Sequence, residues 1–310
     1  MSRRSIPLVL AAVAFVACRT KTEDQAARAD SARDTTTSAS AGATSSAASG
    51  TTTSGTAPRV VNLVAKDYTF EAPAEIPAGW TTFELTDQGQ QIHHAIIVKL
   101  DSGKTGQDFV KAMKPNAPPP RWATPLGGPN APRPGGGTAN ATLNLDPGNY
   151  AIMCFVDLPD HVPHFAKGMV HDLKVTPASR AAAAAPTADI TLTLKDYDFG
   201  LPQSISAGRH TFKVTNEGPQ PHEIEIVRLA PGKTQKDFET WYAKMQGPPP
   251  GEPLGGGNGM VPGREEYFTM DLTPGNYLAI CFFPDGKDGK PHFEHGMIKA
   301  FTIGGATNAN

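Results

Sequence analysis

The stretch YAIMCFVDLPDHVPHFAKGM, residues 150–169, recurs as YLAICFFPDGKDGKPHFEHGM at residues 277–297. Each version contains one cysteine, then a loop, then the motif His-Phe-x-x-Gly-Met. The residues that correspond between the versions are Cys154 and Cys281, His164 and His292, and Met169 and Met297. A thiolate, an imidazole and a thioether brought together in one place suit a soft metal ion, copper above all.

The segment before each loop reads as a β-strand whose cysteine points inward. Side chains alternate between the two faces of a strand. The residues on the same face as the cysteine are Tyr150 and Ile152 before Cys154, and Tyr277 and Ala279 before Cys281. Because these neighbours have the character of core residues, we expect each cysteine to point toward the interior.

The two versions belong to a longer internal repeat. Residues 61–89, VNLVAKDYTFEAPAEIPAGWTTFELTDQG, align without gaps to residues 190–218, ITLTLKDYDFGLPQSISAGRHTFKVTNEG. The shared Lys-Asp-Tyr and Ala-Gly fall in register, and DPGNYAIMCF later matches TPGNYLAICF. A repeat of this kind indicates two copies of one structural unit.

The elements within each copy are short and have the period of β-strands. Apolar residues alternate with threonines at Ile190, Leu192 and Leu194, and turns rich in Pro, Gly and Asn separate such segments. One helix per copy is expected to begin near Thr105 and Thr234. The sequence predicts an all-β protein of two tandem Greek-key β-sandwich domains, each with one short helix and long Pro/Gly-rich loops.

These patterns divide the chain of 310 residues into successive segments. They are a signal peptide with a lipobox (1–18), a disordered Ala/Ser/Thr tether (19–58), the first domain (59–177), an Ala-rich linker (178–187), the second domain (188–304) and a tail (305–310). Since 39% of the residues are hydrophobic, there is enough apolar material for two modest cores.

The N-terminus has the features of an export signal. Arg3 and Arg4 precede an apolar run over residues 6–17, which is too short to span a bilayer. The run ends in FVAC, which resembles the bacterial lipobox, in which the cysteine, here Cys18, carries the lipid. We expect an exported lipoprotein of the cell envelope or periplasm, held at a membrane through Cys18. Ordinary cleavage, which would leave a soluble secreted protein, is the alternative.

A fourth metal ligand is expected from an earlier strand in each copy. Aligning QQIHHAIIVKL with PQPHEIEIVRL places His93 opposite His222 and His94 opposite Glu223. In the second copy His222 shares a face with the isoleucines that follow it, so His222 and its equivalent His93 are the inward histidines. His94 is then the outward neighbour, or an alternative ligand if the strand register differs.

With these residues the chain resembles the cupredoxins, the blue-copper proteins, over nearly all of both copies. In that family one histidine on a strand is followed far downstream by Cys, His and Met around a loop. The ligands that the resemblance implies are His93, Cys154, His164 and Met169 in the first domain, and His222, Cys281, His292 and Met297 in the second. The loops at 155–163 and 282–291 are longer than in the small electron carriers and look more like that of the copper nitrite reductases.

The resemblance implies one copper ion per domain in a type 1 site, and electron transfer as the role. Two imidazoles and a thiolate suit both oxidation states of copper, and a weak axial thioether favours the reduced one. In such sites His164 and His292 would lie nearest solvent, so we expect a redox protein partner to dock near one of them. The alternatives are an envelope protein that captures or delivers copper, and a metal-free sandwich that serves as a binding module.

Oxidase or nitrite reductase activity is a further alternative, since the enzymes of that kind are also built from repeated cupredoxin domains. In the multicopper enzymes, histidines flank the copper cysteine and lead to a second copper centre. The flanking residues in this chain are Met153 and Phe155 around Cys154, and Ile280 and Phe282 around Cys281. We therefore expect an electron carrier or binding protein rather than an enzyme.

Charge and cysteine content exclude other classes of protein. The formal net charge is -2 and no basic block stands out, so no nucleic-acid partner is expected. The Gly-Lys-Thr triplets at 103–105 and 232–234 lack the earlier glycine of a phosphate-binding loop, so no nucleotide is expected. One thiol per copy is not a disulfide framework, and a bridge between Cys154 and Cys281 is not expected, because two equivalent inward positions in separate cores would not meet. Glycine runs at 135–137 and 255–257 are expected in exposed loops.

Overall fold

The structure is a computed structural model that describes residues 57–114, 119–157, 162–178 and 183–304. The expected signal peptide, the lipid-bearing Cys18 and the tail at 305–310 lie outside the described residues. So do nearly all of the 19–58 tether and residues 179–182 of the linker. None of the helices in the described part has both the length and the apolar character that crossing a membrane requires.

The two halves contain the same series of elements. The first half consists of β1 (Arg59–Lys66), β2 (Thr69–Glu71), β3 (Glu75–Pro77), β4 (Gly79–Asp87), β5 (Ile96–Leu100), α1 (Gly106–Ala112), β6 (Ala123–Pro125), β7 (Gly137–Leu145), β8 (Gly148–Met153), the 3-10 helix η1 (His164–Lys167) and β9 (Val170–Thr176). The second half consists of β10 (Ile190–Lys195), β11 (Asp198–Gly200), β12 (Ile205–Ser206), β13 (Gly208–Asn216), β14 (His222–Leu229), α2 (Gln235–Tyr242), β15 (Gly251–Met260), β16 (Glu265–Leu272), β17 (Gly275–Ile280), the 3-10 helix η2 (His292–His295) and β18 (Ile298–Gly304).

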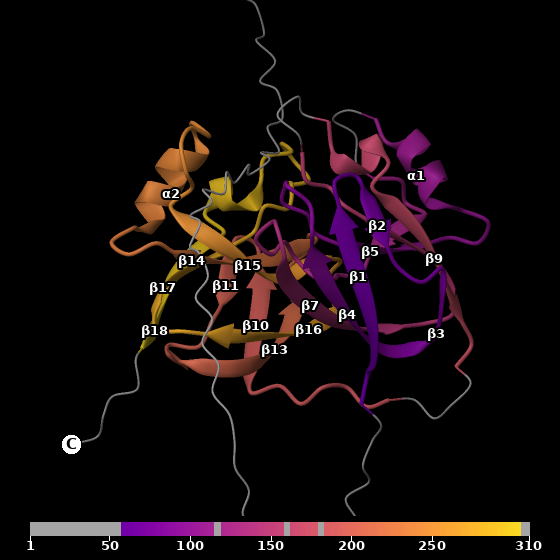
Figure 1. The fold of residues 1–310 in the computed structure, drawn as a ribbon, viewed down its shortest axis with the longest axis horizontal. Helices are drawn as coiled ribbons and strands as arrows, with labels where there is room; N and C mark the ends of the chain where they lie inside the picture. Colours follow the sequence, from indigo (N-terminus) through magenta and orange to yellow (C-terminus); the bar gives the residue numbers. More distant parts are fainter. Residues whose placement is uncertain (1–56, 115–118, 158–161, 179–182, 305–310) are drawn as a thin grey trace, which may run out of the picture. The chain divides into compact units, whose positions relative to one another are not determined.

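The strands form three sheets (Figure 1). Each half has a five-stranded sheet of its own, in the order β3-β9-β8-β5-β6 or β12-β18-β17-β14-β15. The third sheet has eight strands in the order β11-β10-β13-β16-β7-β4-β1-β2, so that each half supplies four of them. Each half is therefore a two-sheet sandwich, and the predicted all-β class is confirmed.

The halves are joined through β7 and β16, which are antiparallel neighbours in the shared sheet, with Thr142 opposite Tyr267. The side chain of Asn140 strengthens this junction: its Nδ2 donates to the carbonyl of Thr269 at 2.7 Å, and its Oδ1 accepts from the Thr269 amide at 2.8 Å. The two halves thus form one continuous hydrogen-bonded structure.

The second glycine run lies in this junction, and the prediction of an exposed loop is wrong for it. Gly255, Gly256 and Gly257 are buried in β15, and Gly257 pairs with Pro129 of the other half. A Cβ atom on Gly256, whose φ is +146°, would collide with the carbonyl of Ile224. Glycine is required here because two backbones approach closely. In the first run, residues 135 and 136 are exposed as expected, whereas residue 137 is buried where β7 begins.

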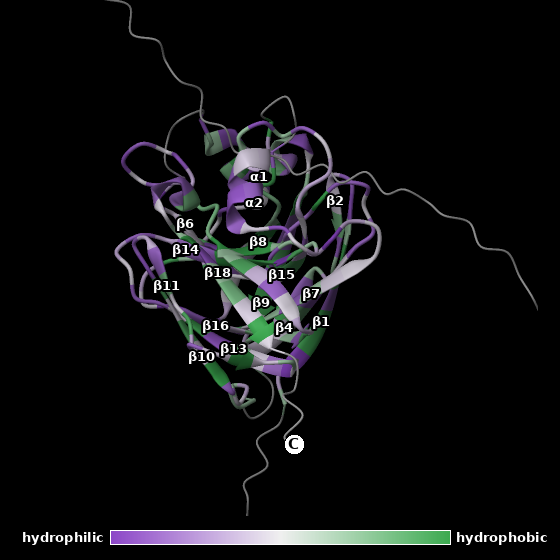
Figure 2. Ribbon diagram, turned by 90° about the vertical axis from the view of Figure 1, so that its left-hand side faces the viewer, coloured by the Kyte–Doolittle hydropathy of each residue, from purple (hydrophilic) through white to green (hydrophobic). Residues whose placement is uncertain are grey.

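The core of each half lies between its two sheets. Along β1 the buried residues alternate with exposed ones, as the period of a strand requires. Figure 2, which colours the ribbon by hydropathy, shows how hydrophobic and hydrophilic residues are distributed over the strands. The core of the first half includes Cys154 and Met169, and that of the second half includes Cys281 and Met297. Both cysteines are buried and free, so they form no bridge with each other, as two inward positions in separate cores require.

Both predicted helices begin where expected. Thr105 and Thr234 are the N-caps of α1 and α2, and each forms a capping box with the aspartate three residues later. These contacts satisfy backbone N–H groups that a helix start leaves unpaired. The Gly-Lys-Thr triplets are therefore turns that open a helix.

Candidate metal centres

Three side chains from distant parts of the first half meet in its core. The Nδ1 atoms of His93 and His164 are 3.0 Å apart, and the Sγ atom of Cys154 lies 3.9 Å from the first and 3.4 Å from the second. All three side chains are fully buried, with 0% exposure. The sulfur therefore faces both imidazoles.

The second half repeats this triangle almost without change. The Nδ1 atoms of His222 and His292 are 2.9 Å apart, and Sγ of Cys281 lies 3.9 and 3.4 Å from them. These three side chains are also fully buried. The recurrence shows that the repeat conserves the arrangement of donor atoms as well as the fold.

A single ion could contact all three atoms of either group. Metal bonds to cysteine sulfur and histidine nitrogen are about 2.3 and 2.0 Å long, which places the ligand atoms of one ion about 3–4 Å apart. The observed separations of 2.9–3.9 Å fall in that range. Two imidazoles and a thiolate, with a thioether nearby, are the donor set of a soft transition metal.

The loop after β8 is folded so that the ligands of the first half come together. The amide of Phe165 donates to the carbonyl of Cys154 at 2.8 Å, and the amide of Cys154 donates to the carbonyl of Met169 at 3.3 Å. Gly168 ends η1 with a φ of 110°, which favours glycine, and lets the chain turn back so that Met169 reaches the core. The same bonds recur around Cys281 and Met297.

A tyrosine and a glutamine cover His164. The ring of Tyr68 meets the imidazole edge-on, with centroids 5.3 Å apart. Gln91 Oε1 lies 3.2 Å from Nε2 of His164, and Nε2 of Gln91 donates to the Tyr68 hydroxyl at 2.7 Å. His164, which the sequence led us to expect nearest to solvent, is fully buried beneath this cover.

The cover of His292 includes a tyrosine and an acid. Tyr197 meets this imidazole at 5.3 Å, but its hydroxyl donates to the buried carboxylate of Asp285. The Nε2 atom of His292 is buried without a hydrogen-bond partner among the described residues, and Oδ2 of Asp285 lies 3.9 Å from it. His292 is therefore also hidden from solvent, beneath a group that includes an acid.

An aspartate holds the outer nitrogen of the other histidine in each half. Oδ1 of Asp67 lies 3.0 Å from Nε2 of His93, and Oδ1 of Asp196 lies 2.6 Å from Nε2 of His222. Sequence reasoning missed both aspartates, although the signal was present: the shared Lys-Asp-Tyr motif supplies this aspartate and the covering tyrosine in each copy. Such partners orient a metal-binding imidazole.

Burial keeps the donor groups neutral before a metal binds. It raises the pKa of the Cys154 thiol to about 12 and raises the pKa of Cys281 well above its usual value. Burial, together with the neighbouring imidazole, lowers the pKa values of His164 and His292 to about 4. At neutral pH both imidazoles are ready to bind a metal, whereas each thiol must lose a proton.

Comparison with known proteins gives structural neighbours only. No family model matches the chain, and no curated protein matches its sequence. A dithionite-reduced auracyanin from Roseiflexus castenholzii is 23% identical over 39% of this chain and 100% of its own length, with a TM-score of 0.26. The blue copper oxidase from Nitrosomonas europaea is 16% identical over 80% of this chain and 86% of its own, with a TM-score of 0.23. A copper-containing nitrite reductase from Thermus scotoductus is 12% identical over 82% and 63%, with a TM-score of 0.22.

These neighbours are consistent with a tandem cupredoxin-domain protein. At such low identities and TM-scores, the likeness alone decides neither fold nor function. The sandwich fold of the two halves rests on their own strand order and cores.

His94 does not point to solvent and does not join the metal group. Its Nε2 accepts a hydrogen bond from the amide of Phe155 at 2.8 Å, and burial lowers its pKa to about 3. The face expected to be outward is covered in both halves by the residue after the cysteine, although β5 begins only at Ile96 and Glu223 lies inside β14. Glu223, its equivalent in the other half, takes the same position, as the alignment predicts.

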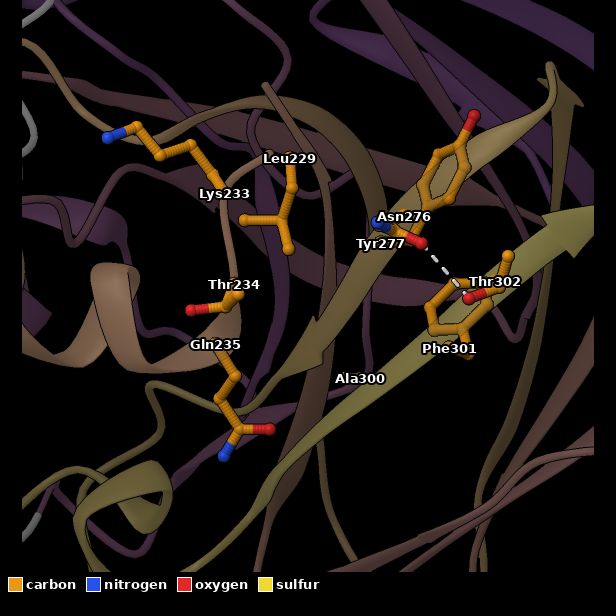
Figure 3. Close-up of a pocket in the computed structure, with 9 residues that line it drawn as sticks. All are labelled: Leu229, Lys233, Thr234, Gln235, Asn276, Tyr277, Ala300, Phe301 and Thr302. Carbon is orange, nitrogen blue, oxygen red and sulfur yellow. Dashed lines mark hydrogen bonds between the residues drawn. The ribbon is translucent and has the colours of Figure 1, made fainter. Parts of the chain in front are cut away.

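Two further features of the structure lie apart from these groups. Asp285, Asp288 and His295 lie within 4.8 Å of one another, but two of the three are exposed and all have hydrogen-bond partners within the protein. The pocket in Figure 3 lies where α2 begins, and none of the proposed metal-ligating residues lines it. Its lining residues are Leu229, Lys233, Thr234, Gln235, Asn276, Tyr277, Ala300, Phe301 and Thr302. The buried triangles remain the best candidates for a functional site.

Proposed function

We propose that this protein binds copper in both halves and transfers single electrons. The proposal is supported above all by the triangle of two imidazole nitrogens and one sulfur, which recurs in both halves with nearly the same separations. A trigonal His₂Cys site with a weak axial methionine is the donor set of blue-copper electron-transfer sites. We assign His93, Cys154, His164 and Met169 to one ion, and His222, Cys281, His292 and Met297 to the other.

The surroundings of the cysteines suit electron transfer. Copper bound to these donors would take up or release one electron. The apolar rings of Phe155 and Phe165 pack together beside Cys154, with centroids 4.9 Å apart, and Phe109 packs against both. These rings form an apolar cluster separate from the core that holds Cys154, and they support the strand end that carries the sulfur. A rigid, dry pocket of this kind limits rearrangement when the charge of the ion changes.

Enzymatic activity remains open, since multicopper oxidases and a nitrite reductase are among the structural neighbours. We propose a carrier rather than an enzyme because Met153, Phe155, Ile280 and Phe282 flank the cysteines where multicopper enzymes have histidines. In the described residues, the two triangles are the only groups of metal-binding side chains that contain cysteine. Turnover of a phenolic substrate or of nitrite by the copper-loaded protein would contradict the carrier assignment.

We further propose that the protein is exported and held at a membrane through a lipid on Cys18, and that a redox protein docks near His164 or His292. Because Tyr68 and Tyr197 cover these histidines, such a partner would contact the tyrosines first. The mass of the mature protein tests the anchor: a diacylglyceryl group on Cys18 is expected, and a mature protein cleaved elsewhere without lipid would refute it.

The visible spectrum of the copper(II)-loaded protein tests the central proposal. We expect an intense charge-transfer band from the cysteine sulfur, reduced by about half in Cys154→Ser or Cys281→Ser and abolished in the double variant. Copper content measured on the same samples distinguishes loss of the ion from loss of the sulfur bond. A colourless wild type that contains copper would refute the assignment for both halves, and a band unaffected by one substitution would refute it for that half.

A further inference from the structure

The turn between the first two strands of each half reaches the metal group from outside. This turn carries Asp67 in the first half and Asp196 in the second, directly after β1 and β10. The two carboxylates lie 3.0 and 2.6 Å from the outer nitrogens of His93 and His222. Each contact is on the ring nitrogen opposite the one that faces the cysteine sulfur.

The contact fixes where the imidazole proton resides. A carboxylate accepts hydrogen bonds but cannot donate them. Nε2 of His93 therefore carries the imidazole proton and donates a hydrogen bond to Asp67. Nδ1 is then left with a free lone pair, which is the form that binds a metal. The same argument applies to His222 and Asp196. Each aspartate therefore selects the tautomer and the ring orientation that the site requires.

Both carboxylates are held in place by further bonds. Oδ1 of Asp67 accepts from the amides of Gln90 and Gln91 at 3.1 and 3.3 Å. Oδ2 of Asp196 accepts from Nε2 of Gln220 at 2.9 Å. The Asp67 and Asp196 side chains keep 34% and 20% exposure, whereas the side chains of His93 and His222 are fully buried, so each aspartate connects a buried imidazole to the surface.

We propose that Asp67 and Asp196 are positioning residues that lower the reduction potential of the copper centre in their own half, an inference that rests on the proposed function. Copper(II) carries one more positive charge than copper(I), so a nearby negative charge stabilises it more. The imidazole transmits this effect, because an acceptor on Nε2 raises the basicity of the ring. The carboxylates thus oppose the axial methionine, which favours copper(I).

The test is Asp67→Asn measured in the Cys281→Ser background, where the first half alone has its sulfur ligand. Redox titration followed in the visible band should show a shift toward copper(I) of at least tenfold, which corresponds to about 59 mV for a one-electron couple. Asp196→Asn in the Cys154→Ser background should behave alike. A potential that is unchanged or lower, with the band intact, would overturn the proposal.

Asp146→Asn is the matched control in the first half. Asp146 is exposed and pairs with Lys99, so this variant removes the same charge from a place without contact to the metal group. Its potential should stay at that of the parent. If Asp146→Asn shifts the potential as much as Asp67→Asn does, the effect is one of net charge and the proposal fails.

A second measurement does not need copper. In the metal-free protein, long-range ¹H–¹⁵N NMR should place the imidazole proton of His93 on Nε2, and Asp67→Asn should weaken that preference. A proton on Nδ1 in the wild type would contradict the positioning role. Failure of the proposed function would appear differently, as the absence of a charge-transfer band in the parent protein.

Discussion

Oε1 of Glu223 accepts a hydrogen bond from the backbone amide of Phe282 at 3.0 Å, directly after the buried Cys281. The amide of Glu223 in turn points at the sulfur of Cys281, at 3.5 Å. In the first half His94 takes the same place and accepts from the amide of Phe155 at 2.8 Å. An acid and an imidazole thus perform one structural task, tying the strand with the first histidine to the strand end with the cysteine.

Replacing Glu223 tests this link. Glu223→Ala leaves a buried amide unpaired, so we expect the free energy of unfolding to fall by about 1–3 kcal/mol. Glu223→Gln keeps an acceptor oxygen and should stay close to the wild type at low pH. Urea unfolding of the metal-free variants measures the difference. Equal losses in both variants would show that the acceptor oxygen is not what matters.

The Glu223→Gln variant also has an expected pH dependence. Burial raises the pKa of Glu223 from its ordinary value of 4.5 to about 7, so the folded state holds the proton more tightly than the unfolded state. The wild type therefore loses stability as the pH rises from about 4.5 through 7. Relative to the wild type, Glu223→Gln should gain stability over that window and level off above it. A constant difference between pH 5 and pH 8 would contradict this assignment.

Copper binding should tighten as the pH rises. The thiols are protonated in the metal-free protein, since burial raises the pKa of Cys154 to about 12, whereas His164, with a pKa of about 4, is neutral. Each ion bound as a thiolate complex thus displaces one proton at neutral pH, and the apparent affinity should rise about tenfold per pH unit. Competition with a chromophoric copper(I) chelator at pH 6, 7 and 8 measures this slope. A flat response would mean that the thiolate is not a ligand.

The cover over His164 should keep small molecules from the first site. Tyr68→Ala removes the ring that meets the imidazole at 5.3 Å and the hydroxyl that Gln91 binds. We expect azide to perturb the visible and EPR spectra of the copper(II) variant but not those of the wild type. Tyr68→Phe, which keeps the ring, is the control. An identical azide response in all three proteins would show that the tyrosine does not act as a barrier.

The glycines of β15 should be intolerant of substitution. In Gly256→Ala the new methyl group collides with the carbonyl of Ile224, and overpacking of this kind costs about 1–3 kcal/mol beyond the strain of a positive φ. Gly135→Ala is the control, since its φ is +75° and nothing lies within 4 Å of the added atom. Thermal unfolding of the two variants separates packing from backbone strain. A similar decrease in Tm for both would contradict the close approach.

Local patterns in the sequence carried much of this structure. Strand parity placed Cys154 and Cys281 inward, and the threonine followed by aspartate marked both helix starts, because such features depend on near neighbours in the chain. The bringing together of His93 with His164 followed from the motif and its repetition. These are the parts of a fold that a short segment specifies by itself.

Contacts between distant segments were not accessible in this way. The glycines at 255–257 have the composition of a loop, yet they are buried because the other half packs on them. His94 was assigned to an outward face, since nothing in the neighbouring residues shows that the amide of Phe155 lies opposite. The role of Asp67 was missed for a related reason. The Lys-Asp-Tyr repeat was visible in the sequence, but the contact between Asp67 and the imidazole of His93, 26 residues later, was not.

Because the two halves share one sheet, neither half can be separated from the other without exposing a strand edge. A first half expressed alone would leave the edge of β7 open, and an open edge is a template for another strand. The strand that fits is one like β16, which the related sequence of a second copy would offer. Separate halves would have to find each other at a rate set by their concentration, whereas covalent linkage makes that encounter intramolecular and independent of dilution.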